Sequence, residues 1–147
     1  DEPMKLAVYN GHPLADKDKI AMSELAGEHL LMLEDGHCLR DQAMGFCFQA
    51  GADEDTHFRA TSLETLRNMV AAGSGITLLP ALAVPPERER DGICYLQCYK
   101  PEPKRTIALV YRPGSPLRAR YEQLAEAIRE HMQGVMAQQC NALKQAV

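Results

Sequence analysis

Two cysteines nine residues apart, Cys38 and Cys47, have the residue type and the spacing that redox chemistry uses. They mark the ends of the stretch "CLRDQAMGFC", which predicts one short helix. A helix rises about 1.5 Å and turns about 100° per residue, so nine steps place the two sulfurs roughly 13 Å apart on opposite faces. A disulfide requires Cα atoms about 4.4–6.8 Å apart. The two cysteines are therefore either unrelated buried residues or a switch whose closure unwinds the helix.

Cys38 is the better candidate for attack on an oxidant. Peroxides react with the thiolate, and Cys38 lies at the start of the expected helix, where free backbone N–H groups and the helix dipole favour an anion. His37 and Arg40 add nearby cations, whereas Glu34 and Asp35 oppose them. The orientation of these side chains then decides which sign dominates at the sulfur.

Cys47 is the better candidate for a reserve thiol. It stands between Phe46 and Phe48, and apolar surroundings keep a thiol neutral and buried. Oxidation of Cys38 would give a sulfenic acid, which either returns on reduction or condenses with a second thiol. Condensation with Cys47 would unwind the intervening segment and so select a second packing of it.

Each of these residues also has a purely structural interpretation. Cysteines at this spacing in an intracellular protein are more often inert core residues than a redox pair. His37 could be a solvated loop histidine, and Arg40 and Asp41 could lie on an exposed helix face. His57, in "THFRA", could line the cysteine pocket or could be an ordinary strand histidine.

Composition excludes several classes of protein. The 147 residues are 46% hydrophobic, which fits one globular domain or part of a larger one. The net charge is −4 and the sequence has no Lys/Arg cluster, so we expect this chain itself not to bind a nucleic-acid backbone. No apolar run of about 18 residues and no signal-peptide pattern occurs, so we expect no membrane contact and a cytoplasmic location. The five cysteines lack CxxC spacing, which argues against a metal centre. Cys94 and Cys98 are interpreted as small apolar strand residues, and Cys140 has no predicted role.

The chain alternates between strand and helix patterns. Thr61 and Glu64 predict a capping box at the start of a helix that Gly73 ends. We expect residues after about 133 to fray or to pack weakly. Strands are predicted at 5–9, 56–62, 75–84, 92–99 and 106–112, and helices at 38–48, 62–73 and 115–132. Residues 22–34 are predicted to form a short helix followed by a strand. This alternation predicts an α/β fold with an at least partly parallel sheet.

Three stretches carry a resemblance to a known family. They are "LMLEDGHCLRDQAMGFCF" (31–48), "FRATSLETLRNMVAAGSGITLLPALAV" (58–84) and "TIALVYRPGSPLRARYEQLAEAIR" (106–129). Together they resemble the regulatory domain of the LysR-type transcriptional regulators, up to about residue 130. "VAAGSGITLLP" is general to that family, whereas "GHCLRD…GFC" resembles its peroxide-sensing members.

The resemblance implies a periplasmic-binding-protein-like fold of two α/β subdomains. Residues 4–103 would form regulatory subdomain II with the redox cysteines, and residues 104–133 would supply a strand and a helix of subdomain I. Residues 134–147 would be a tail. The helix-turn-helix domain and the N-terminal part of subdomain I are expected to be absent from this chain.

The resemblance also implies a function, that of a hydrogen peroxide sensor in a transcription activator rather than an enzyme. Cys38 would be the peroxidatic cysteine and Cys47 the resolving one, joined by a disulfide that remodels the segment between them. His37, Arg40, Asp41 and His57 would support them, with Asp41 holding peroxide or its proton. Neither a metal nor a cofactor is expected.

The expected partners are hydrogen peroxide, a second copy through the regulatory domains, a cellular thiol reductant, and DNA only through the absent helix-turn-helix domain. Two other functions remain open. The chain could be a LysR-type effector module that binds a small anion between subdomains and has incidental cysteines. It could also be a thiol peroxidase that turns over, although a disulfide that requires helix unwinding suits a stored signal better.

Overall fold

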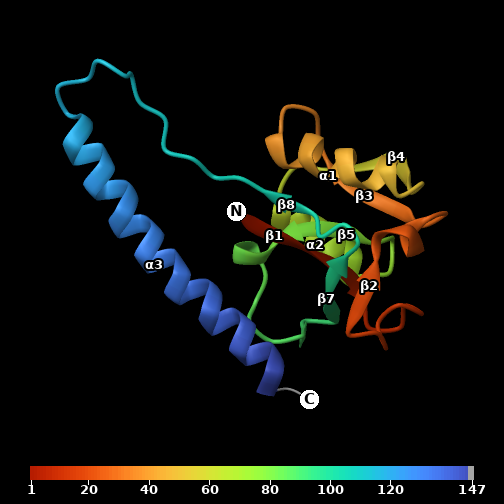
Figure 1. Ribbon diagram of the computed structural model, residues 1–147. Helices are drawn as coiled ribbons and strands as arrows, with labels where there is room; N and C mark the ends of the chain where they lie inside the picture. Colours follow the sequence, from red (N-terminus) through yellow and green to blue (C-terminus); the bar gives the residue numbers. More distant parts are fainter. Residues whose placement is uncertain (146–147) are drawn as a thin grey trace.

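A computed structural model describes residues 1–145, without the side chains of residues 53, 55–57 and 138–145. The elements alternate between strand and helix along most of the chain (Figure 1). In chain order they are β1 (Glu2–Tyr9), β2 (Lys19–Ala21), the 3-10 helix η1 (Met22–Leu25), β3 (His29–Leu33), α1 (Cys38–Gln49), β4 (Asp53–Ala60), α2 (Leu63–Ala71), β5 (Thr77–Pro80), the 3-10 helix η2 (Ala81–Ala83), β6 (Glu89–Arg90), β7 (Ile93–Tyr99), β8 (Lys104–Arg105) and α3 (Arg118–Gln145).

The main sheet is built around β1. This strand pairs antiparallel with β5 on one side and with β7 on the other, so that Leu6 lies opposite both Leu78 and Leu96. All three leucines are buried, and most of β1 is buried along its length, as is typical of a central strand covered on both faces. β2 adds to β7 in parallel. The prediction of a partly parallel sheet is confirmed.

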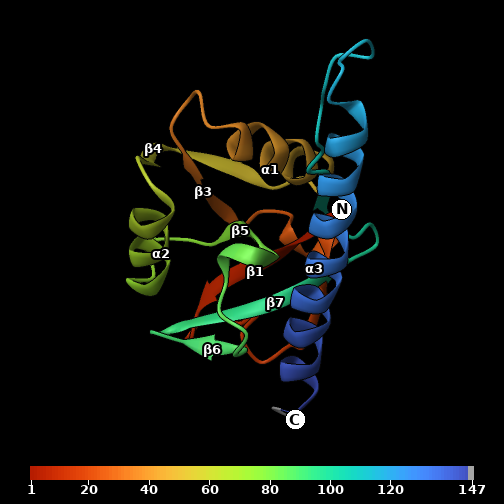
Figure 2. The ribbon, with the colours of Figure 1, turned by 90° about the vertical axis from the view of Figure 1, so that its left-hand side faces the viewer.

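A second, parallel sheet of two strands, β3 and β4, holds the segment with the two cysteines. β3 leads to α1 through residues 34–37, and β4 follows α1 after a short turn, so the helix connects the two strands. Figure 2 shows these three elements together at one end of the body. Two hydrogen bonds of Leu31 join β3 to the start of β5. The Leu31 carbonyl accepts a 2.8 Å bond from the Thr77 hydroxyl, and the Leu31 amide donates a 2.8 Å bond to the Ile76 carbonyl. The strand before Cys38 is thereby anchored to the main core.

The start of α2 differs from its prediction. Its N-cap is Ser62, whose hydroxyl accepts a 3.1 Å hydrogen bond from the Thr65 amide, so the capping box of Thr61 and Glu64 was wrong. The Glu64 carboxylate instead pairs with Arg67 at 3.2 Å, one turn further along. The predicted helix end is confirmed, because Gly73 adopts a φ of +77° and its amide bonds to Val70.

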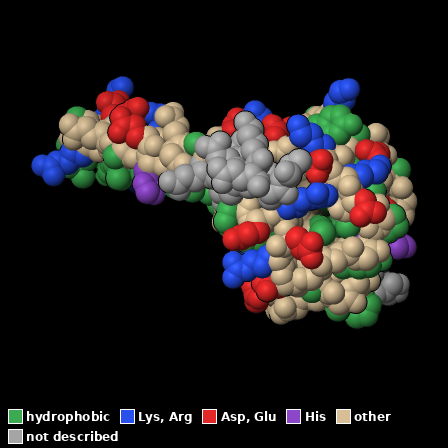
Figure 3. Space-filling view, turned by 90° about the horizontal axis from the view of Figure 1, so that it is seen from below, with side chains coloured by type: hydrophobic (Ala, Val, Ile, Leu, Met, Phe, Trp, Pro, Cys, Tyr) green, Lys and Arg blue, Asp and Glu red, His purple; other side chains and the backbone are tan. Residues whose placement is uncertain are grey.

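The segment after residue 105 also differs from its prediction. Only Lys104 and Arg105 form a strand, paired with Pro3 and Glu2, and the expected strand at 106–112 is wrong. The side chains of Ile107, Leu109 and Val110 are exposed, since the described chain offers this segment no neighbouring strand. α3 extends to Gln145, so residues after 133 do not fray, but Gln133, Gly134 and Ala137 are exposed, which agrees with the weak packing given as the alternative. In Figures 1 and 3, α3 and its leading segment stand away from the body.

α3 is too polar to be a membrane helix. None of the helices within residues 1–145 combines the length and the apolar character needed to cross a bilayer.

Candidate functional site

Cys38 is the first residue of α1 and is exposed. His37, also exposed, is the N-cap, and its carbonyl accepts a 2.9 Å hydrogen bond from the Arg40 amide. The first amides of any helix lack intrahelical acceptors, and this end carries the positive side of the helix dipole. Cys38 thus lies at the exposed start of the helix, where an oxidant in solvent can reach its sulfur.

Cys47 lies near the other end of α1 in the opposite environment. Its side chain is 2% exposed, and it lines a small apolar pocket with Leu30, Met32 and Met44. Burial raises the pKa of the Cys47 thiol to about 12, and the nearby Cys98 thiol adds to the rise. The Cys47 thiol therefore keeps its proton at neutral pH.

The aromatic neighbours of Cys47 contribute unequally to this burial. Phe46 packs against the core as expected, whereas Phe48 is 60% exposed. Leu39 and Ala43 share the buried face of α1 with Cys47 instead. The helix turns Phe48 outward because adjacent residues lie about 100° apart around the axis.

The helix between the two thiols is continuous, as predicted. α1 contains 12 residues, and both cysteines are free thiols. The nine steps from Cys38 to Cys47 span about 13 Å of helix rise. The Cys47 carbonyl also accepts hydrogen bonds from Ala50 at 3.0 Å and Ala52 at 3.1 Å, which hold the end of the helix. A disulfide between the two would break this arrangement.

Arg40 is bound to carboxylates. Its guanidinium donates to both oxygens of Glu54 on β4, at 2.9 and 3.0 Å, and lies 3.4 Å from Asp35. Asp41 is a weaker partner at 3.9 Å and is largely exposed. Arg59 extends the cluster by donating to Asp35 at 2.7 Å.

Sequence reasoning therefore placed Arg40 and Asp41 near Cys38 but missed Glu54. Glu54 lies in the acidic run "DEDT" (53–56), where nothing in the sequence distinguishes it from its neighbours. The side chain of His57, predicted to line the cysteine pocket, lies outside the described residues.

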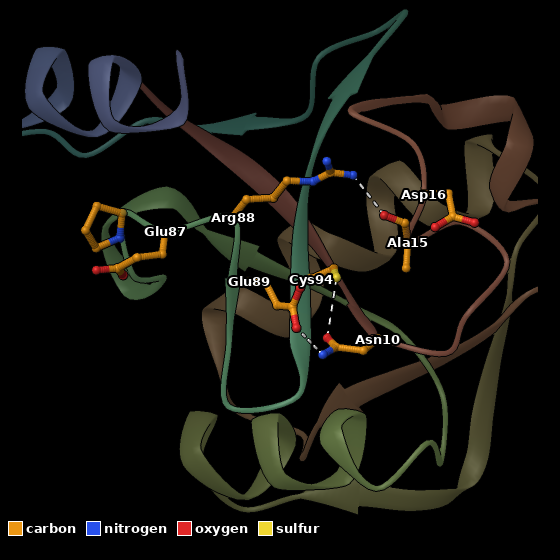
Figure 4. Close-up of a pocket in the computed structure, with 8 residues that line it drawn as sticks. Asn10, Ala15, Asp16, Glu87, Arg88, Glu89 and Cys94 are labelled. Carbon is orange, nitrogen blue, oxygen red and sulfur yellow. Dashed lines mark hydrogen bonds between the residues drawn. The ribbon is translucent and has the colours of Figure 1, made fainter. Parts of the chain in front are cut away.

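The other described cysteines lie on β7. Cys98 is buried near Cys47, and burial raises its pKa to about 12. Cys94 donates a 3.4 Å hydrogen bond to the Asn10 side chain at the wall of a pocket of about 600 Å³ (Figure 4). Both are buried strand residues, as predicted. The side chain of Cys140 is not among those described.

That pocket does not suit a small anion. Its one cation, Arg88, already donates to the backbone carbonyls of Ala15 and Lys17 and pairs with Asp18 at 2.9 Å. The remaining charged lining residues are Asp16, Glu87 and Glu89. Among the described side chains, no group of three or more His, Cys, Asp or Glu residues is placed to hold a metal ion.

Comparison with known proteins places this site in a family context. Residues 1–133 match the family model described as LysR substrate binding domain. The chain is 86% identical over 136 residues to the hydrogen peroxide-inducible genes activator of Pectobacterium carotovorum subsp. carotovorum, covering 92% of this chain and 45% of that protein. It is 77% identical over 147 residues to the DNA-binding transcriptional dual regulator OxyR of Escherichia coli (strain K12), covering all of this chain and 47% of that protein. The chain thus spans about half the length of these relatives.

Two solved structures are also similar. The reduced form of OxyR aligns with a TM-score of 0.80 at 74% identity, over 90% of this chain and 62% of that one. The oxidised form aligns with a TM-score of 0.77 at 80% identity, over 90% of this chain and 63% of that one.

Proposed function

Because the chain belongs to the family of LysR substrate-binding domains, we propose that it is the hydrogen peroxide-sensing part of a transcription activator. The observation that carries this proposal is the pairing of an exposed Cys38 with a buried Cys47 at the two ends of one helix. The similarity to proteins named as hydrogen peroxide-inducible genes activators supports it. We assign Cys38 as the peroxidatic and Cys47 as the resolving cysteine.

The proposed chemistry consumes one peroxide and two thiols. The Cys38 thiolate attacks one peroxide oxygen, so that an S–O bond forms, the O–O bond breaks, and the departing hydroxide takes a proton to become water. The Cys47 sulfur then attacks the Cys38 sulfenic sulfur, an S–S bond forms, and the S–O bond breaks with loss of a second water. Two electrons pass from the thiols to the peroxide, and a cellular thiol reductant returns them.

Because Cys47 is buried, the second step follows only after α1 unwinds. While α1 is intact, Cys47 is neutral, buried and about 13 Å along the helix from Cys38. Unwinding exposes the Cys47 thiol, which restores its ordinary acidity, and brings it within bonding distance. The disulfide then holds the segment in a second arrangement, which the rest of the protein detects.

Residues outside the helix complete the proposal. We assign residues 4–103 to regulatory subdomain II and residues 104–133 to a strand and helix of subdomain I. His37, Arg40, Asp41 and His57 support the peroxidatic cysteine. We assign DNA contact to a helix-turn-helix domain outside residues 1–147, and pairing with a second copy to the regulatory domains, in the cytoplasm.

Counting thiols before and after peroxide tests the proposal. Low peroxide should remove two thiols per chain, peptide mapping should find Cys38 joined to Cys47, and a dithiol reductant should restore both. Cys94→Ser is the matched control, because it removes a buried thiol from another element and should leave the loss at two. An unchanged thiol count, or a disulfide that excludes Cys38, contradicts the assignment.

A further inference from the structure

Four charged side chains join the start of α1 to β4. Arg40, in the first turn of α1, contacts Glu54 on β4 through two hydrogen bonds of 2.9 and 3.0 Å. Asp35, which precedes the helix, lies 3.4 Å from Arg40 and 2.7 Å from Arg59 on β4. Arg59 also lies 3.4 Å from Glu54. The cluster therefore connects both sides of Cys38 to the same strand.

Burial sets the Arg40–Glu54 pair apart from ordinary surface pairs. Both side chains are 10% exposed, whereas the Glu64–Arg67 pair on α2 leaves Glu64 72% exposed. One guanidinium nitrogen of Arg40, Nη2, donates to both carboxylate oxygens of Glu54, and a hydrogen bond between two charged groups is stronger than one between neutral groups. Partial burial also reduces its screening by solvent and salt. The pair thus contributes more to local order than a surface ion pair does.

The position of Arg40 couples this pair to the proposed switch. Arg40 lies between the two cysteines, two residues after Cys38, while Glu54 lies outside them on β4. Closing the disulfide removes about 13 Å of helix rise from the segment that carries Arg40. That collapse moves the Arg40 backbone relative to β4, so the two hydrogen bonds to Glu54 break as the helix unwinds.

We propose that Glu54 is a positioning residue that holds the first turn of α1 in its helical, dithiol form and so sets how readily the Cys38–Cys47 disulfide closes. This inference rests on the proposed function. Glu54 touches neither sulfur in this role and acts through Arg40. Weakening the pair destabilises the reduced form relative to the oxidised one, which favours the disulfide.

The test compares Glu54→Gln with the control Glu64→Gln in the full chain. Amide hydrogen exchange across residues 38–49 is measured in the reduced protein, and the equilibrium between thiols and disulfide is measured in glutathione buffers. Glu54→Gln should speed exchange in this segment and raise the oxidised-to-reduced ratio roughly tenfold, the scale of one charged hydrogen bond, making the midpoint potential about 30 mV more negative. Glu64→Gln should change neither quantity.

A second variant separates positioning from general damage. Glu54→Gln in an Arg40→Gln background should change exchange and potential less than Glu54→Gln does in wild type, because Glu54 acts through Arg40. Glu54→Asp, which keeps the charge on a shorter side chain, should fall between wild type and Glu54→Gln, and it serves if Glu54→Gln fails to fold. Wild-type exchange and potential in Glu54→Gln would overturn the inference. If wild type itself forms no Cys38–Cys47 disulfide, the proposed function fails, whereas exchange in the reduced variants still tests whether Glu54 holds the helix.

Discussion

Cys38 and Cys47 share one helix but differ in exposure. Cys38 is exposed at the start of α1, where an oxidant in solvent can reach its sulfur. Cys47 is 2% exposed, and burial raises its pKa to about 12. This difference fits the proposed roles, in which the accessible Cys38 reacts first and Cys47 reacts only after its surroundings change.

Replacing each cysteine by serine should separate the two roles. Cys38→Ser should abolish the loss of thiols to low peroxide, because a serine hydroxyl is not a nucleophile at neutral pH. Cys47→Ser should still form a sulfenic acid at Cys38, which a sulfenic-acid probe traps, but no intrachain disulfide. If Cys38→Ser loses thiols as fast as wild type, the assignment of the attacking residue is wrong.

The raised pKa of Cys47 also predicts a loss of stability in alkali. The folded state keeps the Cys47 proton up to about pH 12, whereas the unfolded chain releases it near pH 9, so the unfolded state binds fewer protons between these values and stability falls as pH rises. The contribution of this group is complete below pH 9 and should fall by on the order of 1 kcal/mol per pH unit above it.

Denaturant unfolding of wild type and Cys47→Ala between pH 8 and 11 measures this effect. The free energy of unfolding of wild type should fall more steeply above pH 9 than that of Cys47→Ala. Parallel curves for the two proteins would show that Cys47 ionises equally in the folded and unfolded states.

α1 shows which features the sequence could predict at the level of single elements. Its extent was predicted because a β-strand ends just before it and its composition favours a helix. Its attachment to β4 was not, because the Arg40–Glu54 contact joins residues 14 positions apart whose pairing depends on the tertiary fold. At α2, the sequence was interpreted with Thr61 at the cap, whereas the backbone places the next residue, Ser62, there.

Serine and threonine substitutions at the start of α2 test that cap. Ser62→Ala should lower the free energy of unfolding by about 1 kcal/mol, because the Thr65 amide loses its acceptor. Thr61→Ala should change it by no more than about 0.5 kcal/mol, the usual effect of a surface substitution. Thermal unfolding of both variants decides between them, and a larger effect at Thr61 would restore the capping box.

The molecule as a whole consists of a body and an extended C-terminal portion. The apolar pattern of residues 106–112 predicted a strand. Such a pattern shows which side chains favour burial, but it does not show whether a partner strand is present to bury them. In the structure, Ile107 and Val110 are 65% and 87% exposed, and Leu124 and Ile128 on α3 are about half exposed. The sequence therefore identified these side chains as apolar, but it did not predict that they are exposed in this chain.

Limited proteolysis tests this division of the molecule. Chymotrypsin should cut early after Leu109, because residues 106–113 lie outside regular structure and the Leu109 side chain is exposed. Cysteine-containing peptides from β7 should remain in a protected fragment, since β7 pairs with β1 along five residues. Cleavage after Tyr95 or Leu96 within β7 at the same rate as after Leu109 would contradict the boundary.

Hydrogen exchange of residues 38–49 in the reduced and peroxide-oxidised protein tests the central claim most directly. The reduced protein should protect the amides of this segment, because α1 is helical with Cys38 and Cys47 at opposite ends. The oxidised protein, with Cys38 joined to Cys47 as shown by peptide mapping, should lose that protection, because about 13 Å of helix rise cannot shorten to a disulfide span without breaking backbone hydrogen bonds. A bonded pair with unchanged protection across residues 38–49 would contradict the account.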